Sequence, residues 1–125
     1  WAIPGLPSSR RTLAALESVG VSAPGHRSTT LTRDHLDDVD LVVAFEAEHV
    51  RHVRRLAPEA ADRTATLPRF LLPDWPGVAL ATEDPRTWVE VDDPAGGDVE
   101  DFIRCAQDID AQVAQLVARL DALRR

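Results

Sequence analysis

The sequence contains no methionine and no lysine, and it has one cysteine, Cys105. Without methionine the chain does not begin at a usual translation start, so we expect it to be part of a longer protein. Basic side chains that are all arginine, beside abundant alanine and valine, suggest a GC-rich bacterial genome. A single cysteine cannot form an internal disulfide, which favours a reducing compartment. We therefore expect a cytoplasmic protein.

Long apolar runs and a basic surplus are also missing. No apolar stretch approaches the roughly 20 residues that cross a bilayer, and Pro4, Pro7 and the pair Arg10-Arg11 interrupt the opening residues where a signal peptide would be apolar. The net charge of −7 argues against nucleic acid, whose phosphates need a basic face. We expect neither a membrane nor a nucleic acid as a partner. The length fits one domain, residues 1–125.

The first half of the chain shows alternating helix and strand signals. Ser8 or Ser9 can cap a helix that runs to about Val19 and stops at Gly20. A short helix is expected from Thr32 to about Asp38. The apolar run 39–45 (VDLVVAF) is typical of a strand buried on both faces. A helix over 48–56, ended by Pro58, and a second strand over 63–67 would complete a parallel crossover.

The second half contains irregular chain followed by a long helix. Residues 71–88 are rich in proline and turn residues, which predicts loops. From Val99 to Leu123 apolar residues recur at steps of three and four, which predicts an amphipathic helix. Asp98, Glu100 and Asp101 suit its N-terminus. These elements predict an α/β fold with three layers, α/β/α, around a short parallel sheet.

Most common catalytic and metal-binding motifs are absent. The sequence contains no GxGxxG, GxxxxGK[ST], GxSxG or CxxC. His49 and His52 lie one helical turn apart, but no obvious third ligand is near, so we expect no metal and no cofactor. Cys105 stands inside the last helix, and the residue six positions on is Ala111 rather than arginine. We therefore expect Cys105 to pack as a small apolar residue rather than to act as a nucleophile.

The segment 89–102 (VEVDDPAGGDVEDF) is the most informative for chemistry. Asp92 and Asp93 precede Pro94, and two glycines lead into the long helix. An aspartate held by a rigid turn can protonate a leaving oxygen as a general acid. An isolated Asp-Pro pair is more often a turn with helix N-terminal charge, so this dipeptide alone leaves both interpretations open.

An ordered series of segments resembles the low-molecular-weight protein tyrosine phosphatases. The series comprises WAIPGLP (1–7), LAALESVGVSAPGHRSTTLTRDHL (13–36), DLVV (40–43), and Asp93-Pro94 followed by AGGDVEDF. Its order and spacing match that family over essentially all 125 residues. The resemblance implies a phosphatase that cleaves phosphotyrosine monoesters through a cysteinyl-phosphate intermediate.

Site residues follow from this resemblance position by position. Asp93 corresponds to the family's general acid, and Pro94 to the rigid residue beside it. His26 and Arg27 correspond to a segment that supports the catalytic loop. Trp1 corresponds to an aromatic residue that lines the phosphotyrosine cleft, which makes it a candidate substrate-binding residue.

The sequence departs from the family pattern in two ways. The catalytic Cys-x5-Arg-[Ser/Thr] loop is not among these residues, so we expect the first strand and the catalytic loop to be absent and the chain to be inactive as it stands. Loss of a central strand would expose a sheet edge, which predicts instability or self-association through that edge. Where the family often has aromatic residues after Asp-Pro, this chain has Ala95 and Gly96.

Three functions stay open on the sequence. The first is a phosphatase acting on a phosphotyrosine-containing protein or a small phosphomonoester. The second is a non-catalytic, phosphatase-like binding protein whose contact surface would be the acidic stretch 83–110. The third, arsenate reduction, shares the fold in some proteins but depends on further redox cysteines that this chain does not have.

Overall fold

A computed structural model describes residues 4–124, so Trp1 lies outside the described residues. The chain forms two compact units. The first unit combines Trp1–Leu31 with Asp92–Ala111, and the second combines Thr32–Val91 with Gln112–Arg125. Each unit is described by itself below. That residues 1–125 form one domain stays a prediction.

In the first unit, helix α1 extends over Arg10–Ser18. Its N-cap is Ser9, whose hydroxyl oxygen accepts a hydrogen bond from the backbone N–H of Thr12 at 3.1 Å. The helix stops before Gly20, which has φ +78°, a left-handed conformation that glycine adopts without steric cost. The predicted start and stop of this helix are confirmed.

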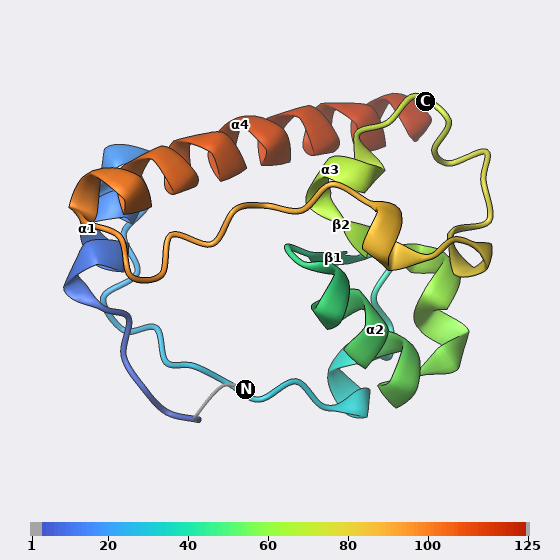
Figure 1. Ribbon diagram of the computed structural model, residues 1–125, viewed down its shortest axis with the longest axis horizontal. Helices are drawn as coiled ribbons and strands as arrows, with labels where there is room; N and C mark the ends of the chain where they lie inside the picture. Colours follow the sequence, from blue (N-terminus) through green and yellow to red (C-terminus); the bar gives the residue numbers. More distant parts are fainter. Residues whose placement is uncertain (1–3, 125) are drawn as a thin grey trace. The chain divides into compact units, whose positions relative to one another are not determined.

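In the second unit, two short parallel strands lie side by side (Figure 1). Strand β1 covers Val42–Ala44 and strand β2 covers Thr64–Thr66, with Val42 opposite Thr64. Helix α2 (Ala47–Leu56) and a 3-10 helix (Pro58–Arg63) connect them. The predicted α/β class and the parallel pairing are confirmed.

The prediction that 39–45 is a strand buried on both faces is wrong. Only Val42–Ala44 form β1, and the side chains of Val43 and Phe45 are each 41% exposed. Among the described residues β1 has a single strand neighbour, β2, so its other edge has no strand partner. A run of apolar residues predicts burial but not which elements supply it.

The core of the second unit forms where α2 packs against β2 and the chain that follows it. Val50, Ala60, Leu67, Phe70 and Leu80 are fully buried. The helix expected from Thr32 to Asp38 is instead one 3-10 turn, Arg33–Leu36, and it places Leu36 against Val53, Ala57 and Ala60. This turn is long enough to bury one leucine, and Thr32 caps it by donating its backbone N–H to Nδ1 of His35 at 3.0 Å.

Residues 71–88, predicted as loops, are mostly irregular but well packed. They follow the short helix α3 (Leu67–Phe70) and include 3-10 turns at Leu80–Thr82 and Pro85–Thr87. Trp75 packs edge-on against Phe70, with ring centroids 5.0 Å apart. Trp88 is also buried. We call residues 71–88 the strap.

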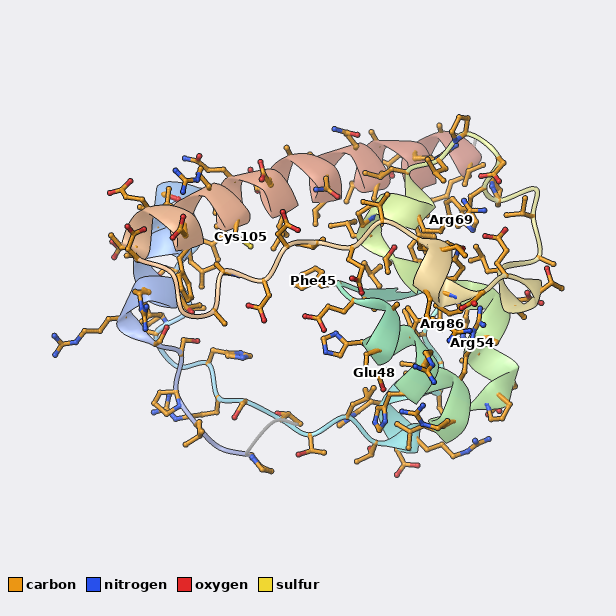
Figure 2. All side chains as sticks on the ribbon, viewed as in Figure 1. Phe45, Glu48, Arg54, Arg69, Arg86 and Cys105 are labelled. Carbon is orange, nitrogen blue, oxygen red and sulfur yellow. The ribbon has the colours of Figure 1, made fainter. Side chains whose placement is uncertain are left out.

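The strap is hydrogen-bonded to a buried arginine, Arg69 (Figure 2). The guanidinium of Arg69, only 4% exposed, donates to both carboxylate oxygens of Asp74 at 2.8 and 3.0 Å. It also donates to both oxygens of Glu83, at 3.0 and 2.9 Å. Glu83 accepts a further hydrogen bond from the indole N–H of Trp88 at 2.8 Å. We call Arg69, Asp74, Glu83 and Trp88 the Arg69 cluster.

Acid should weaken the Arg69 cluster. The pKa of Glu83 lies below its usual value of 4.5, chiefly because Arg69 hydrogen-bonds its carboxylate. A carboxyl group whose pKa is lowered on folding stabilises the fold above its unfolded pKa, and that contribution is lost as the pH falls through the folded value. We expect the free energy of unfolding, measured with urea, to fall as the pH drops below about 4.5. In Glu83→Gln this fall should be smaller, and an unchanged pH slope would contradict the assignment.

Helix α4 extends over Val99–Leu123, as the periodicity predicted. In the second unit its Leu116 is buried, and Arg119 donates to the carbonyl oxygens of Phe70 at 3.0 Å and Leu72 at 2.6 Å. No helix among the described residues is both long and apolar enough to cross a bilayer.

Candidate active site

The candidate site is a tight turn that carries Asp93 immediately before α4. The backbone N–H of Ala95 donates to Asp93 Oδ1 at 2.9 Å, and the N–H of Gly97 donates to the Pro94 carbonyl at 2.8 Å. Gly96 has φ +82°, a conformation that residues with a Cβ rarely adopt. The residues between Asp92 and Asp98 therefore form a defined turn, which we call the acid turn.

Asp93 is exposed, and only one of its two carboxylate oxygens is engaged within the described residues. Oδ1 accepts the Ala95 N–H, whereas Oδ2 has no hydrogen-bond partner there. A carboxyl group held through one oxygen and open at the other can exchange a proton with a substrate oxygen or with water. The geometry agrees with the role that the sequence predicts for Asp93, and that role stays a prediction.

The acid turn leads directly into the capped start of α4. The N–H of Asp101 donates to Asp98 Oδ1, and the N–H of Asp98 donates to Asp101 Oδ2, both at 3.1 Å. The hydrogen bond from the Asp98 backbone is the main reason that the pKa of Asp101 is lowered. Gly97 leaves room for this cap, because a Cβ there would lie 2.5 Å from Asp101 Oδ2. Two residues of the segment 92–98 are thus glycine for geometric reasons.

Cys105 lies on α4 (Figure 2) and contacts the first residue of the acid turn. It is half-buried, and its thiol donates to the Asp92 carbonyl oxygen, with Sγ 3.6 Å away. Its pKa is raised above 9.0, first by burial and then by the nearby carboxylates of Asp108, Asp93 and Asp92. A nucleophilic cysteine needs the opposite, a positive environment that favours the thiolate. The structure therefore agrees with the prediction that Cys105 is not the nucleophile.

His26 and Arg27 lie in a segment that pairs with the chain before α1. Pro7 and Arg27 form an antiparallel bridge. Gly5 N–H donates to the Ser28 carbonyl, and Ser28 N–H donates to the Leu6 carbonyl, both at 2.8 Å. Both His26 and Arg27 are exposed. The segment supports the backbone of residues 5–7, which is a structural role.

The described residues contain no group of three or more side chains placed to hold a metal ion. His49 lies 3.9 Å from the carboxylate of Glu46, one turn earlier. This geometry gives a local ion pair when the imidazole is protonated, rather than a metal centre.

A separate hollow lies in the second unit, beside the segment that enters β1. It is lined by Asp40, Leu41, Val117, Leu120, Asp121, Leu123 and Arg124. The lining is mainly apolar, and Val117 and Leu123 are each 51% exposed. It contains no thiol or imidazole, so nucleophilic catalysis has no group to use there.

The parallel strand pair, the crossover helix and the long final helix define an α/β protein. The sequence matches the family described as low molecular weight phosphotyrosine protein phosphatase over residues 2–125. The chain belongs to this family.

Two curated relatives show how the resemblance is distributed. A protein-arginine-phosphatase of Geobacillus stearothermophilus is 26% identical over 120 residues, which are 96% of this chain and 72% of the relative. The low molecular weight protein-tyrosine-phosphatase Etp of Escherichia coli K12 is 36% identical over 52 residues, which are 42% of this chain and 35% of the relative. The known relatives thus include phosphatases named for two different phosphorylated residues.

Solved structures confirm the fold. The YwlE arginine phosphatase from Geobacillus stearothermophilus has a TM-score of 0.78 and 25% identity, covering 98% of this chain and 70% of its own. A low molecular weight protein tyrosine phosphatase from T. tengcongensis has a TM-score of 0.77 and 25% identity, covering 95% of this chain and 72% of its own. The predicted low-molecular-weight phosphatase fold is confirmed.

Proposed function

We propose that the protein is a phosphatase that hydrolyses phosphotyrosine on proteins, with Asp93 as its general acid. The observation that carries the proposal is the exposed carboxylate of Asp93, held through one oxygen in the acid turn. In the first step Asp93 protonates the phenolic oxygen as the phosphorus–oxygen bond breaks. In the second step Asp93 takes a proton from the water that attacks the cysteinyl phosphate.

The nucleophile of this mechanism is a thiolate in a Cys-x5-Arg loop, whose arginine and backbone amides hold the phosphoryl oxygens. The only cysteine of these 125 residues is Cys105, and its surroundings disfavour the thiolate. We therefore propose that residues 1–125 by themselves do not turn over phosphate esters. Trp1 remains the proposed aromatic wall of the substrate cleft. The chemistry requires no metal or cofactor, and the proposed compartment is the cytoplasm.

Phosphoarginine is a second candidate substrate. The relative that matches 96% of this chain is a protein-arginine-phosphatase. The residues after Asp93-Pro94 are Ala95 and Gly96, which offer no ring to stack on a phenyl group. The acid turn carries three aspartates, Asp92, Asp93 and Asp98, and such a negative surface suits a cationic guanidinium.

Three phosphopeptides of one sequence distinguish these functions in the full-length protein. They carry phosphotyrosine, phosphoarginine or phosphoserine, and kcat/KM is measured for each by phosphate release. The proposal expects kcat/KM for phosphotyrosine to exceed the other two by about tenfold or more. A preference for phosphoarginine supports the second candidate. Turnover of none overturns both and favours a phosphatase-like binding protein.

We further propose that two copies associate through the free edge of β1. Within residues 4–124, β1 pairs only with β2, and unpaired strand edges recruit other strands. Val43 in β1 and Phe45 directly after it have exposed side chains, and the apolar hollow lies in the same unit. We expect analytical ultracentrifugation of residues 1–125 to show a dimer that Val43→Lys dissociates. A monomer at every concentration would overturn this proposal.

A further inference from the structure

Helix α1 reaches the acid turn through the side chain of Arg11. The guanidinium of Arg11 donates from Nη1 to the carbonyl oxygen of Gly97, a residue 86 positions later in the chain. It also lies over the ring of Phe102, 5.1 Å from the ring centroid. Both contacts are inside the first unit. Arg11 thus joins α1 to the end of the acid turn and to the first turns of α4.

The other end of the acid turn is held by Cys105. Its thiol donates to the carbonyl oxygen of Asp92, the residue directly before the proposed acid. Burial raises the pKa of the Cys105 thiol, which favours the protonated form that can donate this hydrogen bond. Asp93 therefore lies between two anchors, Cys105 at the Asp92 carbonyl and Arg11 at the Gly97 carbonyl.

We propose that Arg11 and Cys105 are positioning residues for the proton-transfer step, and this rests on the proposed function of Asp93. The Asp93 side chain is exposed, so the described residues constrain it mainly through the backbone of its turn. Proton transfer requires the carboxyl oxygen within hydrogen-bond reach of the leaving oxygen. A displacement of about 1 Å at such a site can cost up to about 10²-fold in rate.

Leaving-group dependence separates positioning from mere structural support. A good leaving group departs without a proton, whereas a poor one depends on the general acid. A loss of folded protein lowers the rate for all substrates by the same factor. A displaced acid lowers the rate for poor leaving groups alone. The two probes are 4-nitrophenyl phosphate, with a good leaving group, and phenyl phosphate, with a poor one.

The experiment compares kcat/KM for both probes in the full-length protein and its variants. Arg11→Gln is expected to lose about tenfold on phenyl phosphate and less than about twofold on 4-nitrophenyl phosphate. Cys105→Val should show the same pattern more weakly, because a thiol is a weak hydrogen-bond donor. Cys105→Ser keeps a donor at this position, so its kcat/KM on phenyl phosphate should match that of the unaltered protein. The matched control is Arg10→Gln, which removes the same charge from the neighbouring exposed position of α1 and should leave both rates unchanged.

A double-mutant cycle tests whether Arg11 acts through Asp93. If it does, Asp93→Ala combined with Arg11→Gln is no slower on phenyl phosphate than Asp93→Ala alone. Suppose that Asp93→Ala loses rate selectively on phenyl phosphate. The positioning role of Arg11 is then overturned if Arg11→Gln loses the same factor on both probes, or if the losses add in the double variant. If Asp93→Ala itself shows no selective loss on phenyl phosphate, the proposed function of Asp93 fails, and the positioning proposal fails with it.

Discussion

Replacing Asp93 with alanine in the full-length protein is expected to lower kcat for a phosphotyrosine peptide by about 10²-fold or more. The carboxyl group supplies the proton that a phenolate needs in order to leave, and the Ala variant has no other acid in the acid turn with a comparable position. Asp92, the adjacent carboxylate, is exposed but has no side-chain hydrogen bond to the turn among residues 4–124. Steady-state phosphate release measures the effect.

The control for this experiment is Asp110→Ala. Asp110 is an exposed carboxylate on α4 in the same unit, so its removal changes the local charge by the same amount as the loss of Asp93. We expect its kcat to stay within about threefold of the unaltered protein, because its charge acts through solvent. Equal losses in the two variants would show that charge, rather than proton transfer, is the contribution of Asp93. An unchanged rate in Asp93→Ala would remove Asp93 from the mechanism.

The largest expected effect on stability comes from Arg69→Met. This change keeps the apolar stem of the side chain but removes four hydrogen bonds to Asp74 and Glu83. It also leaves two carboxylates facing each other across the gap and releases the strap from α3. Arg69 is buried but Asp74 and Glu83 are partly exposed, so the cost should lie between that of an exposed pair and that of a fully buried one, at about 2 kcal/mol. We expect urea unfolding to show that loss in the free energy of unfolding.

The matched control is Arg86→Met in the same strap. Two guanidinium nitrogens of Arg86, Nε and Nη2, also donate to a carboxylate, that of Asp84. The side chain of Arg86, however, is 70% exposed. Exposed pairs contribute about 0–1 kcal/mol because water and salt screen them. Because the burial differs, we expect Arg69→Met to lower the free energy of unfolding more than Arg86→Met does, although the two ion pairs are similar. Comparable losses in the two variants would contradict the structural role of the Arg69 cluster.

Helix boundaries were predictable wherever a local interaction sets them. Ser9 and Gly20 bound α1 through a side-chain cap and a left-handed residue, both of which are properties of single positions. The long apolar repeat of α4 is equally local. The position of Asp93 before Pro94 located the acid turn for the same reason.

The Arg69 cluster could not be predicted in this way. Arg69 stands in a stretch, 64–70, where nothing marks it as buried, and its partners are 5 and 14 positions away in an irregular segment. The only signal was the presence of Trp75 and Trp88 in a stretch otherwise typical of exposed loops. Large aromatic side chains are seldom fully exposed to solvent, so these two residues indicate packing but do not identify the residues that they pack against.

The ends of α1 and α4 were predictable because each depends on residues near one another along the chain. The fold class was predictable from the order of the expected helices and strands, and the family and the candidate acid from an ordered series of segments. Three features became clear in the folded protein alone: Val43 is exposed, Arg69 is buried, and Arg11 reaches Gly97. These features depend on tertiary contacts between segments that are distant in the sequence. A local pattern of residue types therefore does not predict them.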